Sequence, residues 1–174
     1  KNTNTELTLG ASKSFNRESF FHLDGSLADV RVYDDNIGAS AIAGIAEGIH
    51  YSSSLVGWWL TDSDDLLDHS VNSNNGINAN NSTFQNSISP NKNYGQSGQS
   101  SRGFNDALNY GSVSFIQGET FPISGPQTWA AWVRYQDVAG IRDLFGQWNG
   151  DNNKRSIGFV KSSDTKMYFQ VSTD

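Results

Sequence analysis

The chain contains no cysteine, only 3 prolines and 1 methionine, and charged residues make up only 17% of it. Without cysteine there is no disulfide, no thiolate metal ligand and no cysteine nucleophile. No apolar run approaches the ~20 residues of a membrane-spanning helix. The 12 Lys and Arg residues form no cluster among 18 Asp and Glu residues, so a nucleic-acid backbone finds no electrostatic footprint. These absences argue against disulfide-stabilised, membrane-spanning and nucleic-acid-binding proteins.

What the chain does contain favours short strands joined by polar turns. Apolar residues make up 36% of the 174 residues and aromatic residues 12%, and Gly, Ser and Asn are abundant. A large aromatic side chain buries ~150–250 Å², so aromatic residues must supply much of the core. The composition predicts an all-β fold, and the acidic balance, a net charge of −6, favours solubility without identifying a partner.

Alternation of apolar and polar residues predicts the individual strands. The clearest one follows a predicted turn at Asp24-Gly25 and runs over residues 27–33. Ala28, Val30 and Val32 are expected on its core face, with Leu27, Asp29, Arg31 and Tyr33 on the other. Further strands are predicted at 3–9, 55–60, 112–116, 128–135 and 167–172, with a hairpin formed by 141–148 and 156–161.

One short helix is predicted over residues 39–47. Ile42, Ile45 and Ile49 recur at helical spacing, and Gly48 is a candidate C-cap. The Asn-rich stretch 68–81 and the polar stretch 86–101 are predicted to be loops, since Asn side chains form turns by bonding their own backbone.

Several segments together resemble one family. The segments Leu55-Val56-Gly57-Trp58-Trp59-Leu60 and 68–76 resemble its opening strand and loop, and Leu23–Tyr33 with 39–46 resemble its closing strand and helix. Segments 104–108, 126–134 and 166–171 resemble intervening motifs in the family's order. The chain thus resembles the concanavalin A-like lectin/glucanase superfamily, in its bacterial laminin-G-like branch. The resemblance implies an antiparallel two-sheet jelly-roll sandwich.

The order of these segments is unusual, because the family's ending precedes its beginning. The family strands that separate the segment at 166–171 from the closing strand are absent. Residues 1–50 therefore resemble the end of one module and 51–174 the first two-thirds of the next, or else the chain is a permuted module lacking a hairpin. Since the sequence begins at Lys1, we expect a processed or excised segment, and tandem modules are the favoured origin. We expect both parts to pack as one body with an exposed or partner-filled edge beside Met167–Ser172.

Catalysis by this segment is not expected. The glucanases of the superfamily carry Glu-x-Asp-x-x-Glu on one strand, and this pattern does not occur here. The acidic residues Asp62, Asp64 and Asp65 are typical of a solvated turn. The three histidines, His22, His50 and His69, are scattered and accompany no nucleophile motif.

The resemblance also implies one structural calcium between the opening loop and the closing strand. The matching oxygen-bearing residues are Asp68, Asn72, Asn75 and Asp29, whereas Ala28 stands where the family has a further acid. The alternative, which we favour, is that Asp68 and the asparagines only cap turns. We therefore expect weak calcium binding or none.

Carbohydrate sites combine an aromatic face with hydrogen-bonding side chains. Trp132, Arg134, Trp148 and Asn149 form the candidate set, and Trp148 is the best single candidate because it precedes a polar turn. The alternative is that the strand tryptophans belong to the core.

The leading functional hypothesis is a non-catalytic, lectin-like or adhesive module of a larger exported protein, bacterial or from a phage particle. Its location would be extracellular, on a cell surface or in a virion, and its partner a glycan. The alternative is a structural repeat of a filament, surface layer or phage particle, in which neighbouring copies complete exposed sheet edges.

Overall fold

The computed structural model describes residues 7–10, 23, 25–60, 67–78, 83–85, 101–104, 116–117, 125–135, 140–149, 154–162, 164 and 166–171. For the short strands between 77 and 117, and at some positions near strand ends, only the backbone is described.

The described elements are short strands and one helix. In chain order they are β1 (Thr8–Leu9), β2 (Gly25–Tyr33), α1 (Gly38–Ala46), β3 (Leu55–Trp59), β4 (Ile77–Asn78), β5 (Thr83–Gln85), β6 (Ser101–Phe104), β7 (Ile116–Gln117), β8 (Thr128–Tyr135), β9 (Arg142–Asn149), β10 (Lys154–Lys161) and β11 (Met167–Val171).

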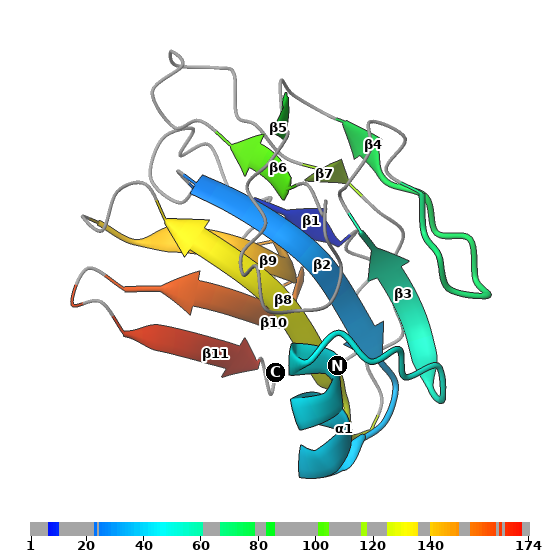
Figure 1. Ribbon diagram of the computed structural model, residues 1–174. Helices are drawn as coiled ribbons and strands as arrows, with labels where there is room; N and C mark the ends of the chain where they lie inside the picture. The colour runs from blue at the N-terminus through cyan, green and yellow to red at the C-terminus, as the bar shows by residue number, and fades with distance from the viewer. Residues whose placement is uncertain are drawn as a thin grey trace.

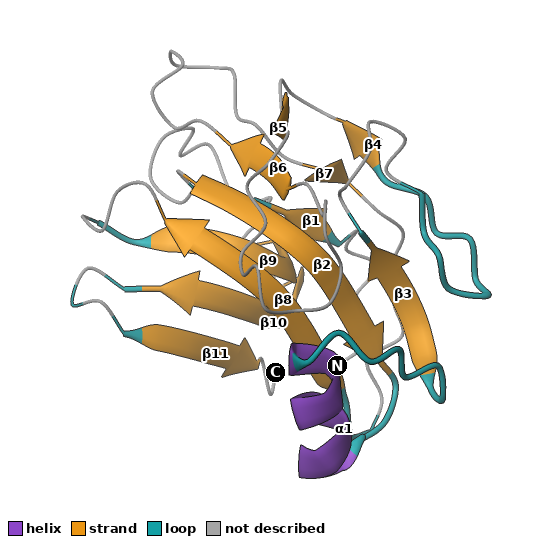
Figure 2. Cartoon of the chain, in the orientation of Figure 1, coloured by secondary structure: helices purple, strands orange, loops and turns teal. Residues whose placement is uncertain are grey.

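The strands form two antiparallel sheets, as Figures 1 and 2 show. One sheet has the order β11-β10-β9-β1-β7-β4. In the other, β2 pairs with β8 along one side and with β3 and β6 along the other, and β5 follows β6. The mostly-β class with one short helix is confirmed, and the arrangement is consistent with a sandwich. The jelly-roll topology stays a prediction.

Strand β2 connects the N-terminal part of the chain to the C-terminal part. Its first residues lie between β6 and β8, and its last residues lie between β3 and β8. Strands from both sides of residue 50 therefore pair within this sheet, and β1 likewise pairs with β7 and β9 in the other sheet.

A bulge in β2 overturns the predicted alternation of its side chains. The register shifts between Ala28 and Arg31, and Asp29 has a positive φ of 51°. An inserted residue reverses which face the following side chains occupy. Leu27 consequently joins Val30 and Val32 in the core, whereas Ala28 pairs with Trp132 on the outer face.

The core lies between the two sheets. Val30 and Val32 are fully buried, which confirms that they face it. They pack in one cluster with Leu9, Leu144 and Phe145 of the other sheet. Burying each such aliphatic or aromatic side chain stabilises the fold by roughly 1.5–3 kcal/mol.

Helix α1 covers part of the outer face of the β2 sheet. Its buried Ile45 packs against Tyr33 and Leu55. The helix ends where Gly48, with φ of 83°, donates to the Ile45 carbonyl and Ile49 donates to the Gly44 carbonyl. These two bonds form a Schellman motif, so the predicted glycine cap is confirmed.

Other differences from the predictions concern short elements. The helix occupies 38–46 rather than 39–47. Of the predicted turn at Asp24-Gly25, Gly25 instead begins β2, and Asp24 lies outside the described residues. Strand β4 lies inside the predicted loop 68–81, β6 begins at the last residue of the predicted loop 86–101, and β5 had no prediction. Backbone hydrogen bonds can form such short strands without an alternating apolar pattern, so the sequence does not predict them. Within the described residues, no helix is long and apolar enough to cross a membrane.

Candidate functional site

The candidate site lies where both sheets end on the same side of the molecule. β8 pairs with β2 and with no other described strand. β11 likewise pairs only with β10 among the described strands. Figure 1 shows these two edge strands, with α1 near their lower ends. We call this side, formed by β8, β10, β11 and the facing part of α1, the open side.

The two sheets end at different distances along the open side. An aromatic row crosses it from Trp129 of β8 to Phe145 of β9, Phe159 of β10 and Phe169 of β11, with ring centroids 5.7, 4.9 and 5.1 Å apart in that order. Trp129 thus faces β9 across the core, so β10 and β11 extend beyond β8.

Exposure increases along this row in the direction of β11. Phe145 is 4% exposed, Phe159 is partly buried and Phe169 is 51% exposed. Every residue of β11 is exposed, including Met167 at 48% and Val171 at 55%. Met167, Phe169 and Val171 alternate along the strand and share the face directed toward the core. This apolar face of β11 is about half exposed.

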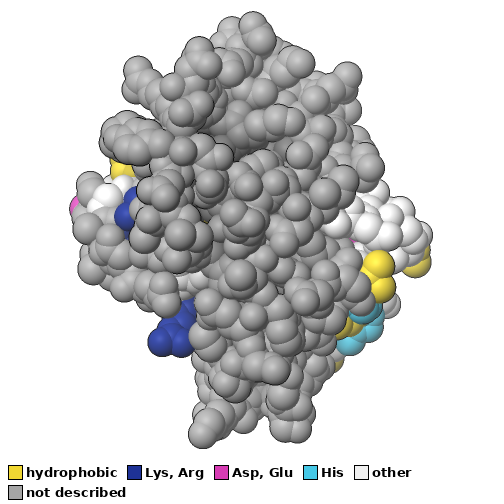
Figure 3. Space-filling view, turned by 90° about the horizontal axis from the view of Figure 1, so that it is seen from above, with side chains coloured by type: hydrophobic (Ala, Val, Ile, Leu, Met, Phe, Trp, Pro, Cys, Tyr) yellow, Lys and Arg dark blue, Asp and Glu magenta, His cyan; other side chains and the backbone are white. Residues whose placement is uncertain are grey.

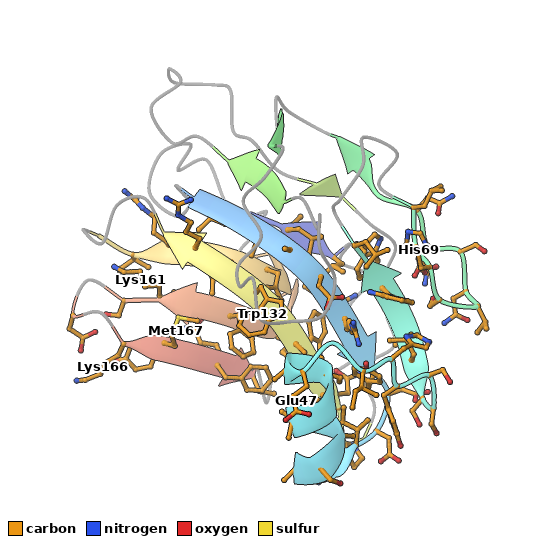
Figure 4. The ribbon with its side chains drawn as sticks, in the orientation of Figure 1. Glu47, His69, Trp132, Lys161, Lys166 and Met167 are labelled. Carbon is orange, nitrogen blue, oxygen red and sulfur yellow. The ribbon has the colours of Figure 1, made fainter. Side chains whose placement is uncertain are left out.

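A cavity of about 290 Å³ lies between the edge of β8, the other sheet and the helix. Its lining includes Trp132 and Val133 of β8, Ile42 and Ile45 of α1, and Met167 of β11. Figure 4 shows Trp132 and Met167 on their two strands. The volume is near the lower limit of ~300–1,000 Å³ typical of ligand pockets, and the lining is mostly apolar. The cavity can accept apolar side chains or a small apolar group.

The predicted glycan-binding residues are distributed over two strands. Trp132 and Arg134 lie on the outer face of β8, where Trp132 is partly buried and Arg134 is exposed. Trp148 and Asn149 are the last residues of β9 in the other sheet, and their side chains lie outside the described set. The structure therefore places Trp132 beside Arg134 and leaves their grouping with Trp148 a prediction.

The predicted calcium ligands take part in protein hydrogen bonds. One Asp68 carboxylate oxygen accepts bonds from the backbone N–H groups of Trp58 and Ser70, each at 2.8 Å. The other accepts bonds from Ser70 Oγ and the Asn74 N–H, also at 2.8 Å. Asn75 Oδ1 accepts the Asp68 N–H at 3.0 Å. These bonds are those of a turn-capping aspartate.

The remaining predicted ligands have other partners. Asn72 donates through its side chain to the Val56 carbonyl at 3.0 Å. Asp29 accepts two bonds from Arg31, at 2.7 and 2.8 Å, and one from the Trp58 indole at 2.7 Å. Among the described residues, no group of three or more His, Cys, Asp or Glu could hold a metal. Calcium binding stays a prediction.

Sequence reasoning missed a stack of side chains around Trp58. The Arg31 guanidinium lies 4.9 Å from its ring centroid, and the exposed His50 stacks on it at 4.5 Å. His69 contacts the same indole at 5.6 Å. Histidine side chains reach the surface in Figure 3, and Figure 4 labels His69. No sequence signal joins residues this far apart, because β2 and β3 bring them together only by pairing.

The charges beneath this stack are buried and paired. Burial disfavours the Arg31 guanidinium, but its hydrogen bonds and charge interaction with Asp29 outweigh this effect and raise the pKa of Arg31. Burial raises the pKa of the neighbouring Tyr33, whose hydroxyl donates to the Tyr51 carbonyl at 3.3 Å. Trp58 thus has side-chain partners on its ring and at its indole nitrogen.

No protein-family model, curated protein or solved structure matches this chain. The resemblance to laminin-G-like modules, and the division at residue 50 that it implies, therefore stay predictions.

Proposed function

We propose that this chain is a non-catalytic adhesive or assembly module that binds its partner along the open side. The observation that carries the proposal is the pair of edge strands, β8 and β11, which flank an apolar cavity. Edge strands present unpaired N–H and C=O groups that pair readily with an added strand.

The composition of β11 supports strand addition. Natural edges are commonly protected by Lys, Pro or a bulge, and β11 has the sequence Met-Tyr-Phe-Gln-Val. Four of its five residues are large, apolar and exposed. Contiguous exposed apolar surface of this kind marks interaction sites. The resemblance to laminin-G-like modules supports the same view, because the family's next strand would follow beside residues 167–172.

An added strand peptide tests this proposal. The probe is a synthetic peptide with the β8 sequence Thr128–Tyr135, which alternates apolar residues, and a control peptide carries Pro in place of Ala131. At a hundredfold excess over the dissociation constant, the first peptide should stabilise the chain by ~2.7 kcal/mol. The control peptide should bind more weakly. Thermal melting that neither peptide alters, in a chain that also remains monomeric, contradicts the proposal.

A matched pair of variants places the binding on β11. Phe169→Lys puts a charge on the apolar edge and should abolish the peptide's effect on melting. Val71→Lys changes a residue that is 93% exposed in the loop after β3 and should leave the effect intact.

A second candidate function is glycan binding on the outer face of β8. It is favoured by a partly exposed indole, Trp132, two residues from the exposed guanidinium of Arg134, because an aromatic face beside a hydrogen-bond donor suits a sugar ring. The proposed set also contains Trp148 and Asn149. On a glycan array, Trp132→Ala and Trp148→Ala should each lose a signal that Val71→Ala retains. An array without signal for the unmodified chain contradicts glycan binding and leaves strand addition standing.

A further inference from the structure

We propose that the partner of the open side is a second copy of this chain, bound by reciprocal strand exchange across a twofold axis parallel to the strands. In this dimer β11 of each copy pairs with β8 of the other. The inference rests on the proposed strand-adding function and specifies its partner.

One sheet extends further than the other on the open side, and this offset allows two copies of the open side to fit together. Trp129 faces Phe145, so the sheet of β9 extends past β8 by two strands, β10 and β11. A twofold rotation about an axis along the strands interchanges the two layers. The protruding strands of one copy then lie against the protruding strands of the other. Each β11 reaches the level of the opposite β8, so both sheets continue through the dimer.

The strand directions suit this pairing. In Figure 1 the arrows of β8 and β11 point in roughly opposite senses. Rotation about an axis parallel to the strands preserves their direction along that axis. The pairing of β8 with β11 of the second copy is therefore antiparallel, like all the strand pairs described within the chain.

The apolar surfaces also match. Met167, Phe169 and Val171 form the apolar face of β11, and each is about half exposed. In the dimer, the same three side chains of the second copy cover them and close the cavity beneath β8. A partner with a polar strand would leave this surface unsatisfied, whereas a second copy supplies an identical apolar strand.

Electrostatics permits the association of two acidic chains at this surface. The whole chain carries a net charge of −6, yet Arg134 is the only charged residue on β8 and β11 together. Antiparallel pairing brings the end of β8 beside the beginning of β11 of the other copy, next to the turn that carries Asp164. The same turn carries Lys166, which forms an ion pair with Asp164 at 2.9 Å, so the charges beside Arg134 are already paired with each other.

The absence of cysteine allows a direct test of the pairing. Ala130→Cys places a thiol on the outer face of β8, and Gln170→Cys places one on the corresponding face of β11. Under mild oxidation, a mixture of the two variants should yield a covalent heterodimer. Each variant alone should remain uncrosslinked. Crosslinking of Gln170→Cys with itself would show that two β11 strands pair with each other and would overturn the proposed exchange.

Sedimentation over a concentration series tests the dimer without modification of the edge. The unmodified chain should dimerise reversibly, and Val171→Lys should raise the dissociation constant at least tenfold. Val71→Lys is the matched control and should leave it unchanged; circular dichroism melts verify that both variants are folded. A chain that stays monomeric yet is stabilised by the β8 peptide overturns this inference and leaves the proposed function intact. A monomer that binds no strand peptide overturns both.

Discussion

The burial of strands β2 and β11 is the opposite of what their compositions predict. β2 contains an aspartate and an arginine, and it is buried at every residue whose side chain is described. β11 contains no charged residue, and it is exposed at every residue. β2 has partner strands on both sides, the second sheet on one face and α1 on the other, whereas β11 has one partner strand and an uncovered face. Position in the sheets, not apolar content, decides burial here.

The charges of β2 remain buried because each has a partner. Asp29 and Arg31 form a bidentate pair, and the bulge at Asp29 directs both side chains to the outer face. A buried charge without a partner is strongly unfavourable, whereas a paired one is tolerated. The exposed apolar residues of β11 have no such local compensation, which supports the proposal that the open side is a binding surface.

The largest expected difference in stability is between a charge placed in β2 and a charge placed in β11. Val30→Asp should destabilise the fold by more than about 4 kcal/mol, since it buries a carboxylate without a partner. Val171→Asp should leave unfolding of the monomer nearly unchanged, because Val171 is 55% exposed. Denaturant unfolding at low protein concentration measures both. Equal losses of stability in the two variants would contradict the contrast between the strands.

The next effect compares a buried ion pair with an exposed one. Arg31→Met leaves Asp29 buried without its cation and should cost about 3–5 kcal/mol. Adding Asp29→Asn to that variant should recover part of the loss. Asp164→Asn breaks the exposed pair with Lys166, whose side chain is 71% exposed, and should produce no measurable change. Similar melting of Arg31→Met and Asp164→Asn would refute the structural role of the buried pair.

Alanine substitutions at two glycines should change the stability in opposite directions, because one glycine is tightly packed and the other is not. A Cβ at Gly146, in β9, would lie 2.5 Å from the Ile157 carbonyl oxygen of β10, so Gly146→Ala should cost about 1–3 kcal/mol as the strands separate. A Cβ at Gly44, in α1, would meet Ile49 at an ordinary 3.6 Å. Gly44→Ala should therefore stabilise the helix by about 0.5–1 kcal/mol. Differential scanning calorimetry distinguishes the opposite signs.

The smallest effect is a pH dependence located at the end of β2. Burial raises the pKa of Tyr33 above its ordinary value of 10.0, so the unfolded chain releases this proton first. Stability should be fully present below about pH 10 and should decline as the pH rises toward the pKa of the folded state. Tyr33→Phe should show a shallower decline in denaturant unfolding between about pH 9 and pH 11. Identical slopes for both proteins would disprove the assignment.

Much of the fold could be predicted from local patterns. The bounds predicted for β8 agree with the structure, and the helix with its Gly48 cap agrees to within one residue. These elements have strong local signals, namely period-two alternation and a glycine that tolerates positive φ. Strands β4 and β6 were missed because strands of 2 and 4 residues are too short to show alternation, and their existence depends on partner strands elsewhere in the chain.

The candidate site was predicted only in outline. Alternation located β11, and an edge beside it was expected, but the cavity and the contribution of Ile42 from α1 arise from segments distant in sequence. Likewise, His50 and His69 had no expected relation, yet both contact Trp58. The bulge at Asp29 was also unexpected. It shifts the phase of the alternation between Leu27 and Val30, but the small apolar Ala28 continues the pattern of Val30 and Val32 and so conceals the shift.

The sequence by itself determined the β class, the strands with clear alternation, the helix and its end, since these depend on contacts between residues close along the chain. Tertiary structure alone decided which strands are central and which are edges. It also decided which face of β2 each side chain occupies beyond the bulge, and where apolar side chains remain exposed. Those properties depend on pairing between strands far apart in sequence, as β2 pairs with β8 about 100 residues later. Backbone groups that form such pairs are the same in every residue type other than proline, so side-chain sequence leaves the choice of partner open.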